Sequence, residues 1–154
     1  MINIKKILIL SFLIFLTSCG YKPIFSSSKS NFSITEIKFF GDKNIAKKID
    51  NNLKIYKNEK NKSVFYDLEI YINENKSTLT KDEKGNPELL SINISVDLIV
   101  FENKAVKSKK KFNQSFIYKN SPNKFNLKKY EKTIERNLID EILSKIILHL
   151  YSLQ

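Results

Sequence analysis

Residues 90–100 carry an apolar side chain at every second position, with polar residues between them except at Ile99. A period of two places every apolar side chain on one face of an extended strand, which no helix can do. The opposite face of this strand carries Ser, Asn and Asp. We therefore expect a sheet with one buried face and one polar face, as antiparallel sheets commonly have. The apolar set is Leu90, Ile92, Ile94, Val96, Leu98 and Val100.

Three further segments are predicted to be strands of the same sheet, because they are rich in aromatic and branched residues. Polar turn segments at 81–87 and 102–110 separate the last three strands, and connections this short make antiparallel pairs. The three segments are residues 32–40, residues 64–73 with 78–80 as an extension after a kink, and residues 111–118.

Two segments carry apolar residues at helical spacing. Residues 45–53 place an apolar side chain at every fourth position, and Asp42 precedes them as a plausible N-cap. Residues 126–153 form a longer amphipathic stripe without Gly or Pro. The sequence therefore predicts an α+β fold with an antiparallel four-stranded sheet and two helices packed on one face. The order is β-α-β-β-β-α, in a single domain over residues 32–154.

The first 18 residues read as a secretory signal peptide, with a basic end, an apolar core over residues 7–16 and small residues before Cys19. Cys19 is the only cysteine in the chain, so it has no partner for a disulfide. The run Leu16-Thr17-Ser18-Cys19 resembles the bacterial lipobox, in which the Cys becomes the first residue of the mature chain and carries the lipid.

Lipidation at Cys19 is therefore expected, with acyl groups such as palmitate as the chain's only prosthetic groups. Several acyl chains anchor a protein stably, where one alone is marginal. Residues 19–31 would form a polar, Ser-rich tether. By resemblance to known sorting rules, Gly20 lacks the Asp that retains lipoproteins in the inner membrane. This indicates the outer membrane of a Gram-negative cell, on the periplasmic side.

The chain carries a net charge of +11, and +9 after removal of residues 1–18, which contain two of its 27 basic residues. Such a charge favours an anionic partner, and export excludes nucleic acid. The composition offers another explanation, because Arg136 is the only arginine and only two residues are alanine. An AT-rich coding bias would raise the lysine content whatever the function.

No catalytic set is apparent in the sequence. His149 is the only histidine, and it lies near the predicted end of the long helix, where a cation is favourable. No Cys-His cluster suggests a metal site, and Asp67 and Glu69, which share one strand face, are more simply solvated surface. We expect neither an enzyme nor a metalloprotein.

One basic cluster is a candidate binding site. Five lysines crowd the predicted turn beside the aromatic residues Phe112, Phe116 and Tyr118. Lysine binds phosphate as a point charge, so lipopolysaccharide phosphates are possible ligands. A solvated turn with lysines that discourage edge-to-edge aggregation is the simpler alternative. The lysines are Lys104, Lys107, Lys109, Lys110 and Lys111.

The predicted mature start, Cys19-Gly20-Tyr21-Lys22-Pro23-Ile24-Phe25, resembles the "CGY-x-P-hydrophobic" start of the lipopolysaccharide-assembly lipoprotein family LptE. The order of elements, the size and the long closing helix are also similar to that family over nearly the whole mature chain. The arginines common in the family's closing helix are reduced here to Arg136, so none of the family's lipid-binding positions is carried over.

The resemblance implies a role without catalysis. LptE-like proteins form a heterodimer with the outer-membrane β-barrel LptD, plug its lumen, and help it fold. The complex inserts lipopolysaccharide into the outer leaflet. Burial in such a partner would also account for exposed aromatic side chains, which we expect at Phe112 and Phe116.

Three alternatives belong to other classes. A periplasm-facing lipid carrier would need a sizeable apolar cavity between the sheet and the helices. An accessory lipoprotein of another envelope transport or secretion complex would pair with a different membrane protein. A lipid-anchored hydrolase is the weakest, because no nucleophile with a base is apparent.

Overall fold

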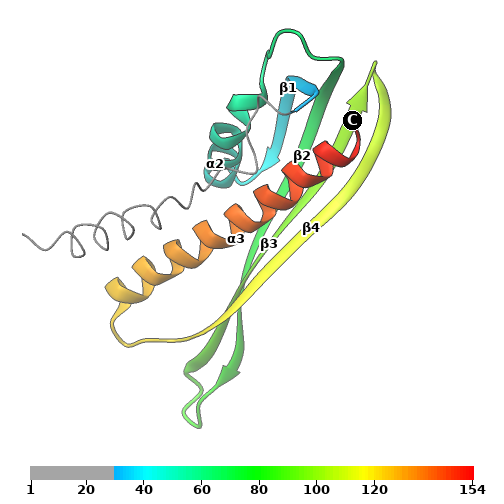
Figure 1. The fold of residues 1–154 in the computed structure, drawn as a ribbon. Coiled ribbons are helices and arrows are strands. Elements are labelled where there is room, and N and C mark those ends of the chain that lie inside the picture. Colours follow the sequence, from blue (N-terminus) through cyan, green and yellow to red (C-terminus); the bar gives the residue numbers. More distant parts are fainter. Residues whose placement is uncertain (1–29) are drawn as a thin grey trace, which may run out of the picture.

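The computed structural model describes residues 30–154, so the predicted signal peptide, Cys19 and most of the predicted tether lie outside the described residues. The described chain forms a four-stranded sheet with two helices over one face (Figure 1). A short 3-10 helix follows the first helix. The elements are β1 (Phe32–Gly41), α2 (Lys43–Leu53), the 3-10 helix (Lys54–Tyr56), β2 (Val64–Lys81), β3 (Pro87–Glu102), β4 (Ala105–Lys119) and α3 (Lys124–Ser152).

The sheet is mixed, and the prediction of a wholly antiparallel sheet is wrong. The strand order is β1-β2-β3-β4, with β2–β3 and β3–β4 antiparallel and β1 parallel to β2. Short connections make the two antiparallel pairs, as expected. Between β1 and β2 the chain returns through α2 and the loop after it, so Val64 begins beside Phe32. Such a helical crossover brings the next strand in parallel.

A β-bulge in β1 explains why its sequence pattern looked irregular. In the sequence, Ile37 and Phe39 fall out of step with Phe32 and Ile34. The register against β2 shifts between Ile34 and Glu36, so that Thr35 is the extra residue. One additional residue returns the apolar positions to the same face. The apolar positions on both sides of the bulge therefore pack on the helices.

The strands are longer than predicted, and the hairpin between β3 and β4 is tighter. Residues 102–110 were expected to form a polar turn, but only Asn103 and Lys104 connect the strands. Both residues have positive φ, 52° and 64°, as in the two-residue turns that match strand twist. The lysines after the turn are therefore strand residues, with side chains that point alternately to the two faces.

Both helices begin at side-chain caps. The carboxylate of Asp42 accepts hydrogen bonds from the backbone N–H groups of Asn44 and Ile45, at 2.8 and 2.9 Å, which confirms the predicted N-cap. The amide oxygen of Asn123 accepts from the N–H of Asn126 at 3.0 Å, at the start of α3. Each cap satisfies donors that the first turn of a helix leaves free.

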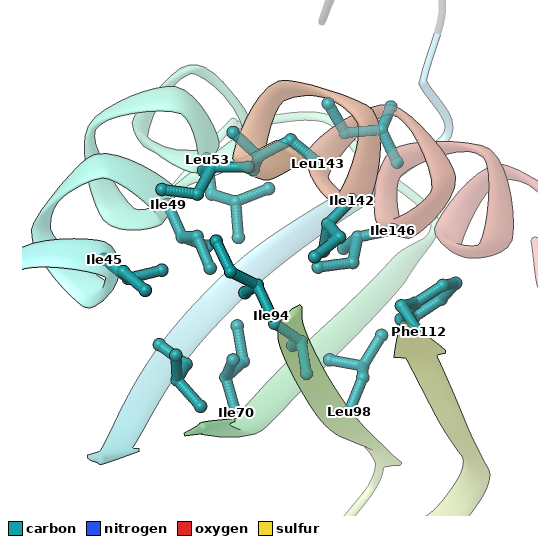
Figure 2. Close-up of a cluster of buried hydrophobic side chains, with 14 of the residues drawn as sticks. Ile45, Ile49, Leu53, Ile70, Ile94, Leu98, Phe112, Ile142, Leu143 and Ile146 are labelled. Carbon is teal, nitrogen blue, oxygen red and sulfur yellow. The ribbon is translucent and has the colours of Figure 1, made fainter. Parts of the chain in front are cut away.

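The core lies between the helices and one face of the sheet (Figure 2). From α2, Ile45, Ile49 and Leu53 line this layer, and from α3 Ile142 and Ile146 point toward the sheet while Leu143 lies beside α2. The apolar side chains predicted for β3 are buried or nearly so. Among the described residues, no helix is both long and apolar enough to cross a membrane. The facing positions on the sheet are Ile70, Ile94, Leu98 and Phe112.

Candidate interaction surface

The face of the sheet that the helices leave uncovered is a candidate interaction surface. Its middle carries uncharged amide and hydroxyl side chains that lie opposite one another on neighbouring strands. These side chains occupy the polar positions of the alternating pattern that predicted the strands. The residues are Asn73, Asn75 and Ser77 on β2, Ser91, Asn93 and Ser95 on β3, and Asn113 and Ser115 on β4.

An aromatic pair borders this polar face. The rings of Phe40 and Tyr71 stack with their centroids 4.5 Å apart and an interplanar angle of 12°. They are 43% and 39% exposed, respectively. The Tyr71 hydroxyl donates a hydrogen bond to Glu69 at 3.3 Å. Ile117, on β4, is 57% exposed and adds an apolar side chain near the other edge of the sheet.

The side chains of this surface suit recognition of a polar partner. Asn side chains both donate and accept hydrogen bonds, and Ser does the same, so the face can match many polar groups without burying a charge. Among residues 30–154, no group of three or more His, Cys, Asp and Glu side chains is placed to hold a metal ion. The aromatic pair at the border of this surface is of a residue type that is enriched in protein interfaces.

The structure divides the five candidate lysines between the two faces of the sheet. Lys109 and Lys111 lie opposite Ile99 and Asp97 on the uncovered face, and Lys110 lies opposite Leu98 on the helix-covered face. The ammonium group of Lys111 is 3.7 Å from the carboxylate of Asp97, a well-exposed pair that contributes little stability. Of the three consecutive lysines, Lys109 and Lys111 therefore share the outer face and Lys110 does not.

Lys107 pairs with a carboxylate, and Lys104 lines a hollow that contains carboxylates. Lys107 is the extra residue of a bulge in β4, and its ammonium group lies 2.8 Å from Glu102. This contact raises the pKa of Lys107. Lys104 lines a hollow of about 180 Å³ with Glu36, Asp67 and Glu69. Lys38 also lines this hollow, but three carboxylates against two ammonium groups disfavour a bound phosphate.

Lys110 belongs to a contact that sequence reasoning missed. The hydroxyl of Ser108 lies 2.8 Å from Nε2 of His149, which ties β4 to the last turns of α3. Burial, and then the charge of Lys110, lower the pKa of His149. Lys110, Lys145 and His149 line one hollow on the surface. Because a hydrolytic dyad needs a neighbour that stabilises the imidazolium, these cations favour a structural role for the pair.

The aromatic residues beside the lysines are not all exposed, which corrects part of the expectation. Phe112 is 6% exposed and packs in the core, with its ring centroid 6.2 Å from that of His149. Tyr118 is 5% exposed, whereas Phe116 is 43% exposed as expected. Phe112 therefore needs no partner to cover it.

A second polar cluster lies between the sheet and α3, and no sequence signal indicated it. The hydroxyl of Tyr118 donates to Glu131 at 2.6 Å, and Lys76 lies 3.6 Å from both Glu131 and Glu74. Lys48 on α2 pairs with Glu135 on α3 at 2.5 Å. These contacts turn the two acidic side chains of the first half of α3 toward the body of the protein.

No protein-family model matches this sequence, and no curated protein matches it either. The fold does match solved structures. Uncharacterized lipoprotein B from Nitrosomonas europaea superposes with a TM-score of 0.64 at 11% identity, covering 86% of this chain and 91% of that one.

Two further solved structures have a similar fold. Rare lipoprotein B from Shewanella oneidensis matches with a TM-score of 0.55 at 15% identity, covering 77% of this chain and 95% of that one. A minor lipoprotein from Acinetobacter baumannii matches with a TM-score of 0.57 at 9% identity, covering 78% and 93%. The chain therefore has a fold found in bacterial lipoproteins.

Proposed function

We propose that this chain is a non-catalytic outer-membrane lipoprotein that helps a large LptD-like β-barrel to assemble and plugs its lumen. The barrel complex would insert lipopolysaccharide into the outer leaflet. The uncharged polar middle of the uncovered sheet face carries the proposal, on a fold shared with rare lipoprotein B, which is also called LptE. The predicted lipobox at Cys19 and the family-like start of the mature chain support it.

The physical fit is between two polar surfaces. The interior of a transmembrane barrel is polar, and a plug must satisfy its hydrogen-bonding groups without burying unpaired charges. The Asn and Ser side chains of β2, β3 and β4 suit this requirement, since each can donate or accept. The stacked Phe40 and Tyr71 would provide an anchor at the rim, as aromatic residues often do in interfaces.

A lipid carrier is supported less well. It needs an apolar cavity between the sheet and the helices, and that layer is filled by a continuous cluster of buried side chains in the described chain. An accessory lipoprotein of another envelope complex would use the same polar face. The identity of the partner therefore decides between these functions.

The first test is the identity of the partner. The full chain, tagged at its C-terminus, would be extracted in mild detergent, purified, and analysed by mass spectrometry. A large β-barrel protein at one-to-one stoichiometry, together with an acylated Cys19 peptide, is the expected result. A monomer, or an inner-membrane transporter in place of the barrel, would contradict the proposal.

A matched pair of variants tests which surface binds the barrel. Asn93 is at the centre of the polar face on β3, so Asn93→Arg would bury a charge in the interface. We expect it to remove the barrel from the purified complex. Asn137→Arg introduces the same side chain at an exposed position of α3 and should leave the complex intact. Equal yields of barrel with both variants would exclude the polar face.

Direct contact with lipopolysaccharide is a separate part of the proposal. Lys109 and Lys111 are the candidate lysines that share the outer face, so the double variant Lys109→Gln, Lys111→Gln should weaken lipopolysaccharide binding. The matched control is Lys107→Gln, because Lys107 already pairs with Glu102. Unchanged binding in the double variant would leave the chain with a scaffold role only.

A further inference from the structure

The first half of α3 extends beyond α2, and one side of it is covered by no other helix or strand of the described chain (Figure 1). Toward the C-terminal end of α3, the apolar side chains Ile139 and Leu143 are buried, and Leu143 lies beside α2 (Figure 2). Followed back along the helix in steps of three or four residues, the same side becomes basic. We call it the α3 basic face, and it consists of Lys124, Phe125, Lys128, Lys129, Lys132 and Arg136.

The charge of the α3 basic face is not neutralised within its own segment. Glu131 and Glu135 are the only acids between residues 124 and 136. Glu131 accepts a hydrogen bond from Tyr118 on β4, and Glu135 pairs with Lys48 on α2. Both acids are therefore turned inward while the cations are exposed. A uniform lysine bias in composition does not explain this separation of signs across the helix.

Phe125 is the second unusual feature of this face. Its side chain is 79% exposed, more than that of any other large hydrophobic residue in the described chain. It lines a shallow hollow of about 230 Å³ with Lys128, Lys129 and Lys132. The lysine stems add apolar surface around the ring while their ammonium groups reach outward. An aromatic ring among cations is typical of helices that lie at a bilayer surface.

We propose that the α3 basic face docks on the surface of an anionic phospholipid bilayer. Phe125 would enter the boundary between headgroups and acyl chains, and Lys128, Lys129 and Lys132 would lie against lipid phosphates. This inference requires neither a barrel nor lipopolysaccharide, so it stands apart from the proposed function.

The side-chain types favour lipid over a protein partner. Protein interfaces are enriched in Arg and depleted in Lys, and this face has five cations of which only Arg136 is arginine. Lysine is a flexible point charge, which suits a fluid array of phosphates better than a fixed acidic surface. Each lysine near an anionic membrane strengthens binding about fivefold.

Tryptophan fluorescence can test the contact locally, because the chain has no Trp. Phe125→Trp in the full-length chain gives a single reporter on the α3 basic face. The matched control is Phe65→Trp. Phe65 lies on β2, is 53% exposed, and is two residues before the acidic Asp67. Both variants would be mixed with two types of vesicle, one of phosphatidylcholine alone and one of phosphatidylcholine with phosphatidylglycerol. Each vesicle type would also be prepared with brominated acyl chains, which quench Trp fluorescence.

We expect the emission of the Phe125→Trp variant to shift to the blue and to be quenched only in phosphatidylglycerol vesicles, and that of the Phe65→Trp variant to respond in neither. Adding Lys128→Gln, Lys129→Gln and Lys132→Gln to Phe125→Trp should weaken docking about a hundredfold and abolish the quenching.

Two outcomes would overturn the proposal directly. The first is equal quenching of the Phe125→Trp variant in both vesicle types, and the second is quenching that survives the three Gln changes. Shielding of the same reporter by polyglutamate but by neither vesicle would assign the α3 basic face to an acidic protein, and this would also overturn the proposal.

Discussion

The hydroxyl of Tyr118 donates a 2.6 Å hydrogen bond to Oε1 of Glu131, which joins the end of β4 to the side of α3 that faces the sheet. Tyr118 is 5% exposed, and burial and the hydrogen bond to Glu131 raise its pKa. Tyr118→Phe should destabilise the fold by about 2 kcal/mol, because a part-buried carboxylate loses its neutral donor. Urea unfolding followed by circular dichroism measures this loss.

Tyr71→Phe is the control for that change. The Tyr71 side chain is exposed, and its hydroxyl makes a longer, 3.3 Å bond to Glu69, so loss of this bond should cost less than about 0.5 kcal/mol. If the two variants lose equal stability, the Tyr118–Glu131 bond does not hold the helix to the sheet.

The contact between Ser108 and His149 predicts a pH dependence of stability near neutrality. Burial and Lys110 hold the pKa of His149 below the usual value of about 6.5. As the pH falls below 6.5, His149 takes up a proton in the unfolded chain more readily than in the folded chain. The free energy of unfolding therefore decreases from about pH 6.5 down to the lower pKa of His149 in the folded chain. The part-exposed ring limits the effect to below about 1 kcal/mol. Thermal unfolding between pH 7.5 and 5.5 measures the decline.

His149→Gln separates this titration from the other groups. Glutamine can still form a hydrogen bond with Ser108 but does not titrate. The stability of the His149→Gln variant should therefore change less with pH than that of the wild type over the same range. An identical slope in the two proteins would show that another group causes the decline.

Much of the fold follows from the spacing of the apolar residues and from the turn residues in the sequence. The buried positions of β3 and both helices are those that the alternation and the helical spacing indicate, except that Tyr130, which the spacing places in the stripe of α3, is 47% exposed. The direction of β1 was missed, because pairing direction depends on the path of the chain through α2, and the sequence shows only that a helix is present. The bulge at Thr35 was missed because one extra residue makes a regular strand look irregular.

The candidate surface was only partly predictable, and the lysine hairpin shows why. Three consecutive lysines, Lys109 to Lys111, favour a solvated loop by composition, yet they lie in an edge strand where charges discourage aggregation. The pairing of Ser108 with His149 joins residues 41 positions apart, so it depends on how α3 lies across β4. No local pattern carries that information.

The turn between β3 and β4 offers a stabilising substitution. Lys104 has a φ of 64°, which is costly for a residue with a Cβ and free of strain for glycine. Lys104→Gly should therefore be more stable than Lys104→Ala by about 1 kcal/mol, since both remove the charge and only one relieves the strain. Urea midpoints of the two variants give the comparison. A more stable alanine variant would mean that the turn relaxes to a different conformation.

Gly41 ends β1 in a conformation that only glycine tolerates. Its φ is +103°, and a Cβ built on it would come 1.9 Å from the backbone oxygen of Ile72 on β2. The two residues form the last pair of the parallel ladder, so Gly41→Ala must push the end of β1 away from β2. We expect a loss of about 3 kcal/mol or more in urea unfolding, with faster hydrogen exchange at the β1–β2 junction.

Gly85→Ala isolates the conformational part of this cost, because Gly85 also has positive φ, +80°, but no atom within 4 Å of its Cβ position. That variant should lose only about 1 kcal/mol, and equal losses in the two would mean that the close approach to Ile72 contributes nothing.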